Sequence, residues 1–235
     1  ETVFKLIAAL SFIISPLFLY LWLKKLANKK VAFVASACYF FLPYRLLDLY
    51  VRGDIAELVS FVFIPLIFLF LDKVQKEKKM TAVLSGGILY ALLILSHNAI
   101  AFIFTPIFIA YAIIFNKNKG AVICFFMVMV GIVLSSFFWL PAILEGKYVH
   151  TNLLVNKIYI DNFIPIVNLF YSNWGFGPEV SLKGGLSPQI GILYTGISLL
   201  ALAFVRKIKK KKELLFWLCV FLYAAFMTTS LSKFL

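Results

Sequence analysis

The chain has 235 residues, of which 63% are hydrophobic and 14% are charged, and its mean hydropathy is +0.99. A water-soluble domain of this length cannot bury so much apolar surface, so the composition excludes a soluble globular fold and favours a membrane protein. A formal net charge of +13 often signals nucleic-acid binding. Here the lysines form short clusters between apolar runs without interleaved aromatics, so we expect no nucleic-acid partner.

Apolar runs of roughly 20 residues, the length that a membrane-spanning helix needs, follow one another along the chain. Helices are expected because lipid cannot satisfy exposed backbone groups. We therefore expect an all-α polytopic transmembrane bundle of about eight spans within one integral membrane domain, residues 1–235. The expected spans are 6–23, a segment from 31 that breaks at Pro43, 55–71, 80–96, 99–115, 121–144, 189–205 and 214–230. The more polar residues 145–188 are expected to form an extracytoplasmic loop.

Basic clusters follow every second apolar run and contain most of the 23 Lys and Arg residues. Because short loops rich in Lys and Arg stay on the cytoplasmic side, we expect these loops to face the cytoplasm. The opposite face then carries a balanced set of acidic and basic groups. Cys38, Cys124 and Cys219 lie inside apolar runs, so we expect neither a disulfide framework nor a thiolate metal site.

Residues 44–57 place two arginines and three carboxylates between two apolar runs, where ionisable groups are costly unless they have a function. If 44–52 is helical, the spacing of Arg45, Asp48 and Arg52 puts them on one side. Guanidinium groups there suit a lipid-linked phosphate, so Arg45 and Arg52 are candidate substrate-binding residues. The alternative is that they pair with Asp48 or with lipid head groups.

Asp54 and Glu57 have the spacing of a capping box directly before an apolar run. Capping is one interpretation; the other is that their oxygens hold a divalent cation or meet a sugar hydroxyl. A divalent cation is therefore a possible cofactor, with no ligand set assigned. Asp48, Asp54, Glu57 and His97 are the candidate catalytic residues.

His97 and Asn98 form a very short connection between two apolar runs. His97 either caps a helix end or relays a proton, and Asn98 either contacts substrate or serves the turn. Trp139 is a candidate substrate contact whose alternative is interfacial anchoring. Trp174 lies in an aromatic, glycine-containing loop, which either stacks on sugar rings or packs on the membrane.

Five stretches resemble one family of bacterial polytopic membrane proteins, which take their label from 6-pyruvoyl-tetrahydropterin synthase. They are PYRLLDLYVRGDIAE (43–57), LSHN (95–98), SSFFWLPAILEGKYV (135–149), YSNWGFG (171–177) and GGLSPQIG (184–191). The resemblance implies a GT-C-like fold, that of membrane glycosyltransferases using polyprenyl-phosphate-linked sugars outside the cytoplasmic membrane. It also implies a main catalytic acid upstream of this chain and a continuation beyond Leu235. Because the chain begins with Glu1 and not with Met, we expect a fragment.

The label does not predict pterin chemistry, since a pterin synthase of that name needs a cluster of zinc-binding histidines and this chain has only His97 and His150. We expect a GT-C-like glycosyltransferase whose partners are membrane lipids and a polyprenyl-phosphate-linked sugar. The alternatives are a transporter or flippase of a lipid-linked or hydrophobic solute, and a non-catalytic membrane scaffold. The expected spans have no charge near their centres, which disfavours ion-coupled transport.

Overall fold

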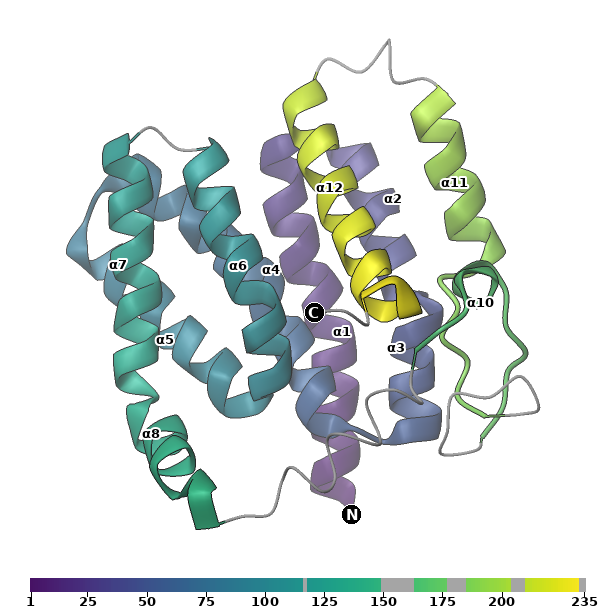
Figure 1. The fold of residues 1–235 in the computed structure, drawn as a ribbon. Coiled ribbons are helices and arrows are strands. Elements are labelled where there is room, and N and C mark those ends of the chain that lie inside the picture. The colour runs from purple at the N-terminus through teal and green to yellow at the C-terminus, as the bar shows by residue number, and fades with distance from the viewer. Residues whose placement is uncertain (116–117, 149–162, 177–184, 204–209, 233–235) are drawn as a thin grey trace. The chain divides into compact units, whose positions relative to one another are not determined.

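The computed structural model describes residues 1–115, 118–148, 163–176, 185–203 and 210–232. Every regular element in these residues is helical, which confirms the expected all-α fold (Figure 1). The chain divides into two compact units, which are described separately: residues 1–41 with 53–147, and residues 42–52 with 148–235. The single membrane domain expected from the sequence stays a prediction.

The first unit consists of long apolar helices packed side by side. They are α1 (Thr2–Leu26), α2 (Lys29–Phe40), α4 (Ile55–Glu77), α5 (Met80–Ser96), α6 (Asn98–Phe115), α7 (Asn118–Leu134) and α8 (Ser136–Glu145). The closest packing joins α5 to α7, α1 to α4, α4 to α5 and α1 to α2. The bounds expected for the fourth apolar run, 80–96, are those of α5.

The second unit has shorter helices. They are α3 (Pro43–Leu47), the π-helical η1 (Asp48–Arg52), α10 (Ile166–Phe170), α11 (Ile192–Ala203), α12 (Lys211–Thr228) and the 3-10 turn η4 (Ser230–Ser232). The backbone N–H of Ile190 donates to the carbonyl of Leu169 at 2.7 Å. Gly191 has a φ of +99°, and a Cβ there would lie 3.1 Å from Pro43 Cγ, so a larger residue would be strained.

Four stretches of the described residues are long and apolar enough to cross a membrane: Thr2–Leu26, Lys29–Arg52, Ile55–Glu77 and Asn98–Phe115. The bent pair Lys119–Leu134 and Ser136–Tyr148 makes a fifth if it counts as one span. The apolar helices Met80–Ser96 and Ile192–Ala203 are shorter. The expected membrane bundle is thus supported, and the expected count of about eight spans is not confirmed.

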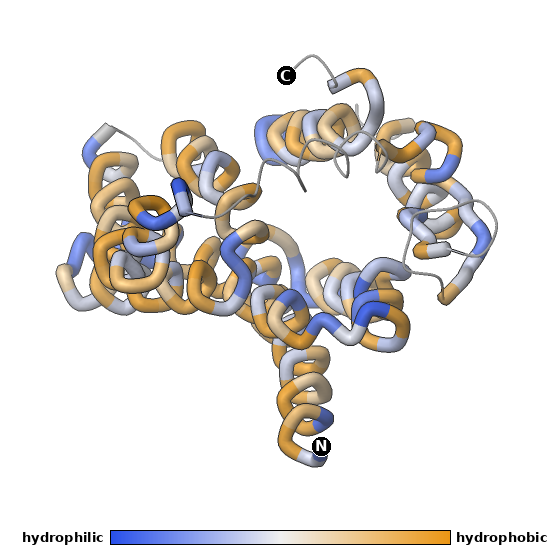
Figure 2. Tube along the Cα trace, turned by 60° about the horizontal axis from the view of Figure 1, so that its bottom comes forward, coloured by the Kyte–Doolittle hydropathy of each residue, from blue (hydrophilic) through white to orange (hydrophobic). Residues whose placement is uncertain are grey.

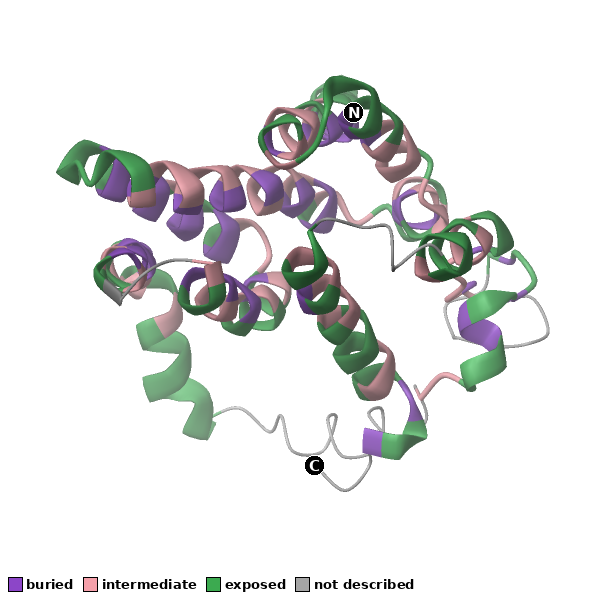
Figure 3. Ribbon diagram, turned by 90° about the horizontal axis from the view of Figure 1, so that it is seen from above, coloured by how far each residue is buried: buried purple, intermediate pink, exposed green. Residues whose placement is uncertain are grey.

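Large apolar side chains cover much of the helix surface. Figure 2 shows apolar residues along most of the length of the helices, and Figure 3 shows buried and exposed positions on different sides of the same helices. Phe102 of α6, for example, is 83% exposed within the chain. Large apolar side chains exposed along whole helices are costly in water and suit contact with lipid.

The sixth apolar run departs from the single span expected over 121–144. It is broken at Ser135 into α7 and α8, which are bent by 66°. The Ser135 hydroxyl donates to the carbonyls of Gly131 (2.9 Å) and Ile132 (3.2 Å), and Trp139 Nε1 donates to the Ile132 carbonyl at 2.9 Å. These side chains satisfy the last carbonyls of α7, so the backbone can turn there at little cost.

Glycines allow the close approach of α5 and α7. A Cβ on Gly131 would lie 2.5 Å from Tyr90 Cδ1 and 2.7 Å from the Gly87 carbonyl oxygen. A Cβ on Gly87 would lie 2.5 Å from Val130 Cγ1. Because no real side chain tolerates such contacts, this packing requires residues without a Cβ, as is common where membrane helices touch.

Candidate functional site

Asp54 caps the first turn of α4. Gly53, directly before Asp54, has a φ of +63°, a conformation that glycine adopts readily. The Asp54 Oδ1 then accepts the backbone N–H of Glu57 at 2.9 Å. The capping interpretation of Asp54 is therefore confirmed, and the cap holds its carboxylate at the N-terminus of α4.

His97 occupies the junction between α5 and α6. Its backbone N–H donates to the Leu93 carbonyl at the end of α5, and its Nδ1 accepts the backbone N–H of Ile100 in the first turn of α6. The capping interpretation of His97 is thus confirmed as well. The bond at Nδ1 fixes the orientation of the ring, with Nε2 on the side away from Ile100.

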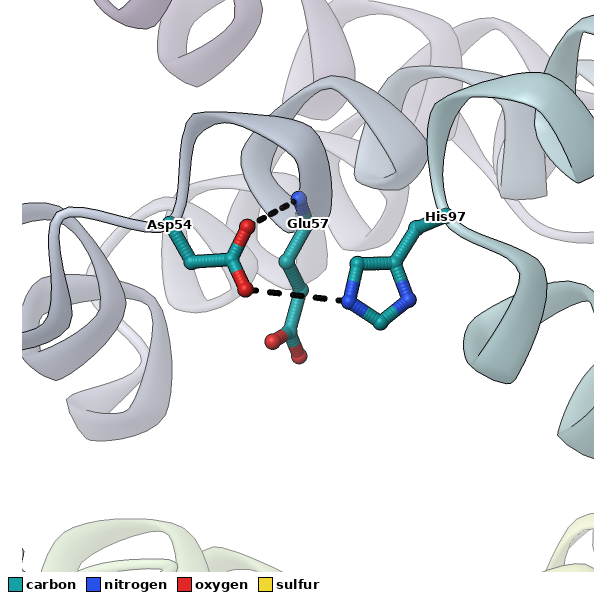
Figure 4. Close-up of side chains that lie close together, drawn as sticks. All are labelled: Asp54, Glu57 and His97. Atoms are coloured by element: carbon teal, nitrogen blue, oxygen red, sulfur yellow. Dashed lines mark hydrogen bonds and ion pairs between the residues drawn. The ribbon is translucent and has the colours of Figure 1, made fainter. Parts of the chain in front are cut away.

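Asp54, Glu57 and His97 come together, although His97 is far from the two acids in the sequence (Figure 4). His97 Nε2 lies 3.7 Å from Asp54 Oδ2, and one donor atom from each of the three residues lies within 4.8 Å of the others. Glu57 is buried, at 3% exposure, while Asp54 and His97 are half-buried. We call this group the acid–imidazole cluster.

The hydrogen bond to His97 Nδ1 determines what the cluster can do. Because Nδ1 accepts the Ile100 N–H, the single hydrogen of the neutral ring resides on Nε2 and faces Asp54. The separation of 3.7 Å between Nε2 and Asp54 Oδ2 is too long for a direct hydrogen bond. A water or a substrate hydroxyl beside the pair can hydrogen-bond to both atoms, and a cation can lie between them.

The second unit holds its own charged group, in a segment where α3 passes into the π-helical turn η1. Arg45 and Asp48 are buried, at 2% and 0% exposure. Arg52 Nη1 lies 3.3 Å from Asp48 Oδ1 and donates to the Tyr44 hydroxyl at 2.7 Å. Pairing with Asp48, the alternative to substrate binding, is therefore present for Arg52, and π-helical turns are frequent at functional positions.

The remaining candidates have different surroundings. Asn98 is the first residue of α6 and is exposed. Trp139 donates from Nε1 to the Ile132 carbonyl, so it fixes the bend between α7 and α8. Trp174 belongs to the second unit and is 42% exposed. Parts of the expected loop 145–188, and His150 within it, lie outside the described residues.

Reasoning from the sequence missed Asp72, which lies one residue beyond the third expected span, 55–71. The structure places it inside α4, half-buried, where its Oδ2 accepts Trp22 Nε1 at 3.1 Å and its Oδ1 accepts the Tyr111 hydroxyl at 2.9 Å. Trp22 also stacks on Phe68, with ring centroids 4.8 Å apart. Asp72 thus ties α1, α4 and α6 together. The adjacent lysines made it look like a loop residue.

Comparison with known proteins identifies a family for this chain. A family model described as 6-pyruvoyl-tetrahydropterin synthase related domain, membrane protein, matches residues 1–233. No curated protein and no solved structure matches the chain.

Proposed function

The chain belongs to the 6-pyruvoyl-tetrahydropterin synthase related family of membrane proteins, and from this premise we propose that it is a GT-C-like glycosyltransferase. It would transfer a sugar from a polyprenyl-phosphate carrier at the extracytoplasmic face of a bacterial cytoplasmic membrane. We retain about eight membrane spans with the basic loops in the cytoplasm, because basic clusters follow every second apolar run. The family description names a pterin synthase, but the two histidines of the chain give no cluster for that chemistry.

The observation that carries the proposal is the acid–imidazole cluster. Sugar transfer to a hydroxyl needs a group that takes the hydroxyl proton as the new bond forms. An imidazole nitrogen 3.7 Å from a carboxylate oxygen, beside a buried glutamate, is a suitable arrangement for holding an acceptor hydroxyl and receiving its proton. We assign the taking of the proton to the carboxylate of Asp54, and the positioning of the acceptor to Glu57 and to His97, whose Nε2–H faces Asp54.

The carrier phosphate needs positive charge as it leaves. Within the second unit, Arg45 and Arg52 are the guanidinium groups that suit this task, since guanidinium binds phosphate oxygens through two parallel hydrogen bonds. Asp48 then serves to hold the Arg52 side chain in place, as its ion pair with Arg52 at 3.3 Å supports. Trp174 and Asn98 are further candidates for contact with substrate.

A transfer assay tests the proposal. The full-length protein is reconstituted in vesicles with polyprenyl-phosphate carrying radiolabelled glucose or mannose, and label appearing in the aqueous or lipid acceptor fraction is measured. Asp54→Asn keeps a helix-capping oxygen but removes the carboxylate that takes the proton, so transfer should fall by about 10²- to 10⁴-fold. Arg52→Ala should abolish transfer, and Arg52→Lys should retain a part because the charge remains. Glu145→Gln, at an exposed acid of α8, is the control.

The same vesicles separate the alternatives. Unchanged transfer by both Asp54→Asn and Arg52→Ala would refute the site assignment. Movement of the intact labelled carrier across the bilayer without cleavage of its sugar–phosphate bond would instead identify a flippase.

A further inference from the structure

We propose that Asp54, Glu57 and His97 bind one divalent transition-metal cation, of the Zn²⁺ or Mn²⁺ type, where α4 begins and α5 passes into α6. The binding of the cation follows from the geometry of these three residues alone. Its role in sugar transfer rests on the proposed function.

The spacing of the donor atoms fits a shared ion better than it fits direct contact. A cation held about 2.1 Å from each ligand in tetrahedral geometry sets its ligands about 3.4 Å apart. His97 Nε2 and Asp54 Oδ2 are 3.7 Å apart, and the donor atoms of all three residues lie within 4.8 Å. Side-chain movements of about 1 Å would therefore close the ligand set around an ion.

The chemistry of the donors selects the kind of cation. Two carboxylates and one imidazole suit borderline metals, whereas Mg²⁺ and Ca²⁺ favour ligand sets made of oxygen alone. Glu57 is 3% exposed, and a carboxylate so far from water is stabilised by a bound cation. Three protein ligands also leave an open coordination position, as in catalytic zinc sites.

The two capping bonds affect metal binding differently. Asp54 uses Oδ1 for the Glu57 N–H and turns Oδ2 toward His97, so its cap is compatible with a bound ion. His97 would bind through Nε2, and its ring hydrogen would move to Nδ1, which now accepts the Ile100 N–H. Loss of that bond lowers the metal affinity by about five- to tenfold, which a three-ligand site tolerates. Metal binding should therefore loosen the first turn of α6.

In sugar transfer, the open coordination position would take the oxygen of the acceptor hydroxyl and ease the loss of its proton to a carboxylate oxygen that does not bind the ion.

Metal content of the purified protein tests the inference without reference to activity. The full chain, carrying a tag without histidines and with its three cysteines replaced by serine, is reconstituted in lipid nanodiscs and stripped with chelator. It is then equilibrated with Zn²⁺ or Mn²⁺ and desalted, and bound metal is measured by mass spectrometry. We expect about one ion per chain for one of the two metals. Amide hydrogen exchange at Ile100 should become faster on loading.

The variants are chosen to keep the helix caps. Asp54→Asn and His97→Asn retain a capping oxygen, and Glu57→Gln retains size. Each should weaken metal binding by about 100-fold or more. Replacing residues that only hydrogen-bond to metal ligands already lowers the affinity by about 10- to 100-fold. His150→Asn removes the other histidine of the chain and should bind as the parent does. Binding below about a tenth of an ion per chain, or equal binding by the parent and His97→Asn, would overturn the inference.

Metal binding and sugar transfer can each be refuted while the other stands. A loaded protein that transfers no sugar would retain the metal site and reject the glycosyltransferase. A protein that binds neither metal but transfers sugar in excess chelator would reject the metal site and retain the enzyme.

Discussion

Asp72 provides the sharpest test of how the first unit is held together. Its two carboxylate oxygens accept hydrogen bonds from Trp22 of α1 and Tyr111 of α6, so one side chain of α4 joins three helices. Asp72→Ala removes both acceptors. Asp72→Asn keeps one oxygen for the Trp22 N–H, and its amide can donate to the Tyr111 hydroxyl, which is able to accept.

The expected loss of stability follows from these two bonds. A side-chain hydrogen bond between membrane helices contributes about 1–2 kcal/mol at the upper end of what is measured. Asp72→Ala should therefore lower the free energy of unfolding by about 2–4 kcal/mol. Asp72→Asn preserves both contacts without a formal charge, so its loss should be about 1 kcal/mol.

Cys124 gives a local readout of this loss. It is buried at 1% exposure, and its thiol donates to the carbonyl of Leu71, the neighbour of Asp72, at 3.6 Å. In a background where Cys38 and Cys219 are serine, a thiol reagent reacts with Cys124 only when the helices open. If opening is at equilibrium, the labelling rate should rise about 30- to 700-fold for Asp72→Ala and about fivefold for Asp72→Asn.

Two results would refute this reasoning. Equal labelling of Cys124 in the parent and Asp72→Ala would mean that the two bonds contribute nothing to holding the helices together. Equal acceleration by the alanine and asparagine variants would mean that the charge, and not hydrogen bonding, stabilises the unit. Glu77→Gln, at an exposed acid of the same helix, serves as the control and should label as the parent does.

Other substitutions test the remaining local features. Gly131→Ala should cost about 1–3 kcal/mol in detergent unfolding, because its Cβ meets Tyr90, whereas Gly196→Ala points into open space and should be neutral or stabilising. Asp54→Ala should cost about 1 kcal/mol and speed amide exchange in the first turn of α4, an effect that Asp54→Asn should not show. Ser135→Ala should straighten the bend between α7 and α8, measured as a longer distance between spin labels on the two helices. An unchanged distance would assign the bend to another cause.

Local features of the fold could be predicted from the sequence because their causes are local. The bounds of α5 follow from an apolar run that starts after four charged residues and stops at His97. The cap at Asp54 follows from an acid three residues before Glu57 and ahead of an apolar run. Pro43 ended the preceding helix as expected, since proline is favoured only in a first helical turn.

The rest could not be predicted because it depends on side chains that are distant in the sequence. Whether Asp72 belongs to a helix or to a loop depends on Trp22 and Tyr111, which are 50 and 39 residues away. The approach of His97 to Asp54 depends on how α4 and α5 pack. The bend at Ser135 depends on a hydroxyl that competes with the backbone, and hydropathy does not register such a bond.

The 66° bend has a consequence for the surrounding lipid. Residues Lys119–Leu134 rise about 24 Å along their own axis, and Ser136–Tyr148 adds only about 8 Å in that direction while reaching about 18 Å sideways. If α7 stands upright in the membrane, the pair thus extends to about the thickness of the hydrocarbon layer. Residues Ser136–Tyr148, which we call the foot, then run closer to the membrane plane than to its normal. Phe137 and Ile143 on this foot are exposed and apolar, so they would wedge beneath the head groups of one leaflet. A helix that lies in one leaflet displaces head groups and splays the acyl chains around it, so lipid order should be lower beside α8 than beside the other helices.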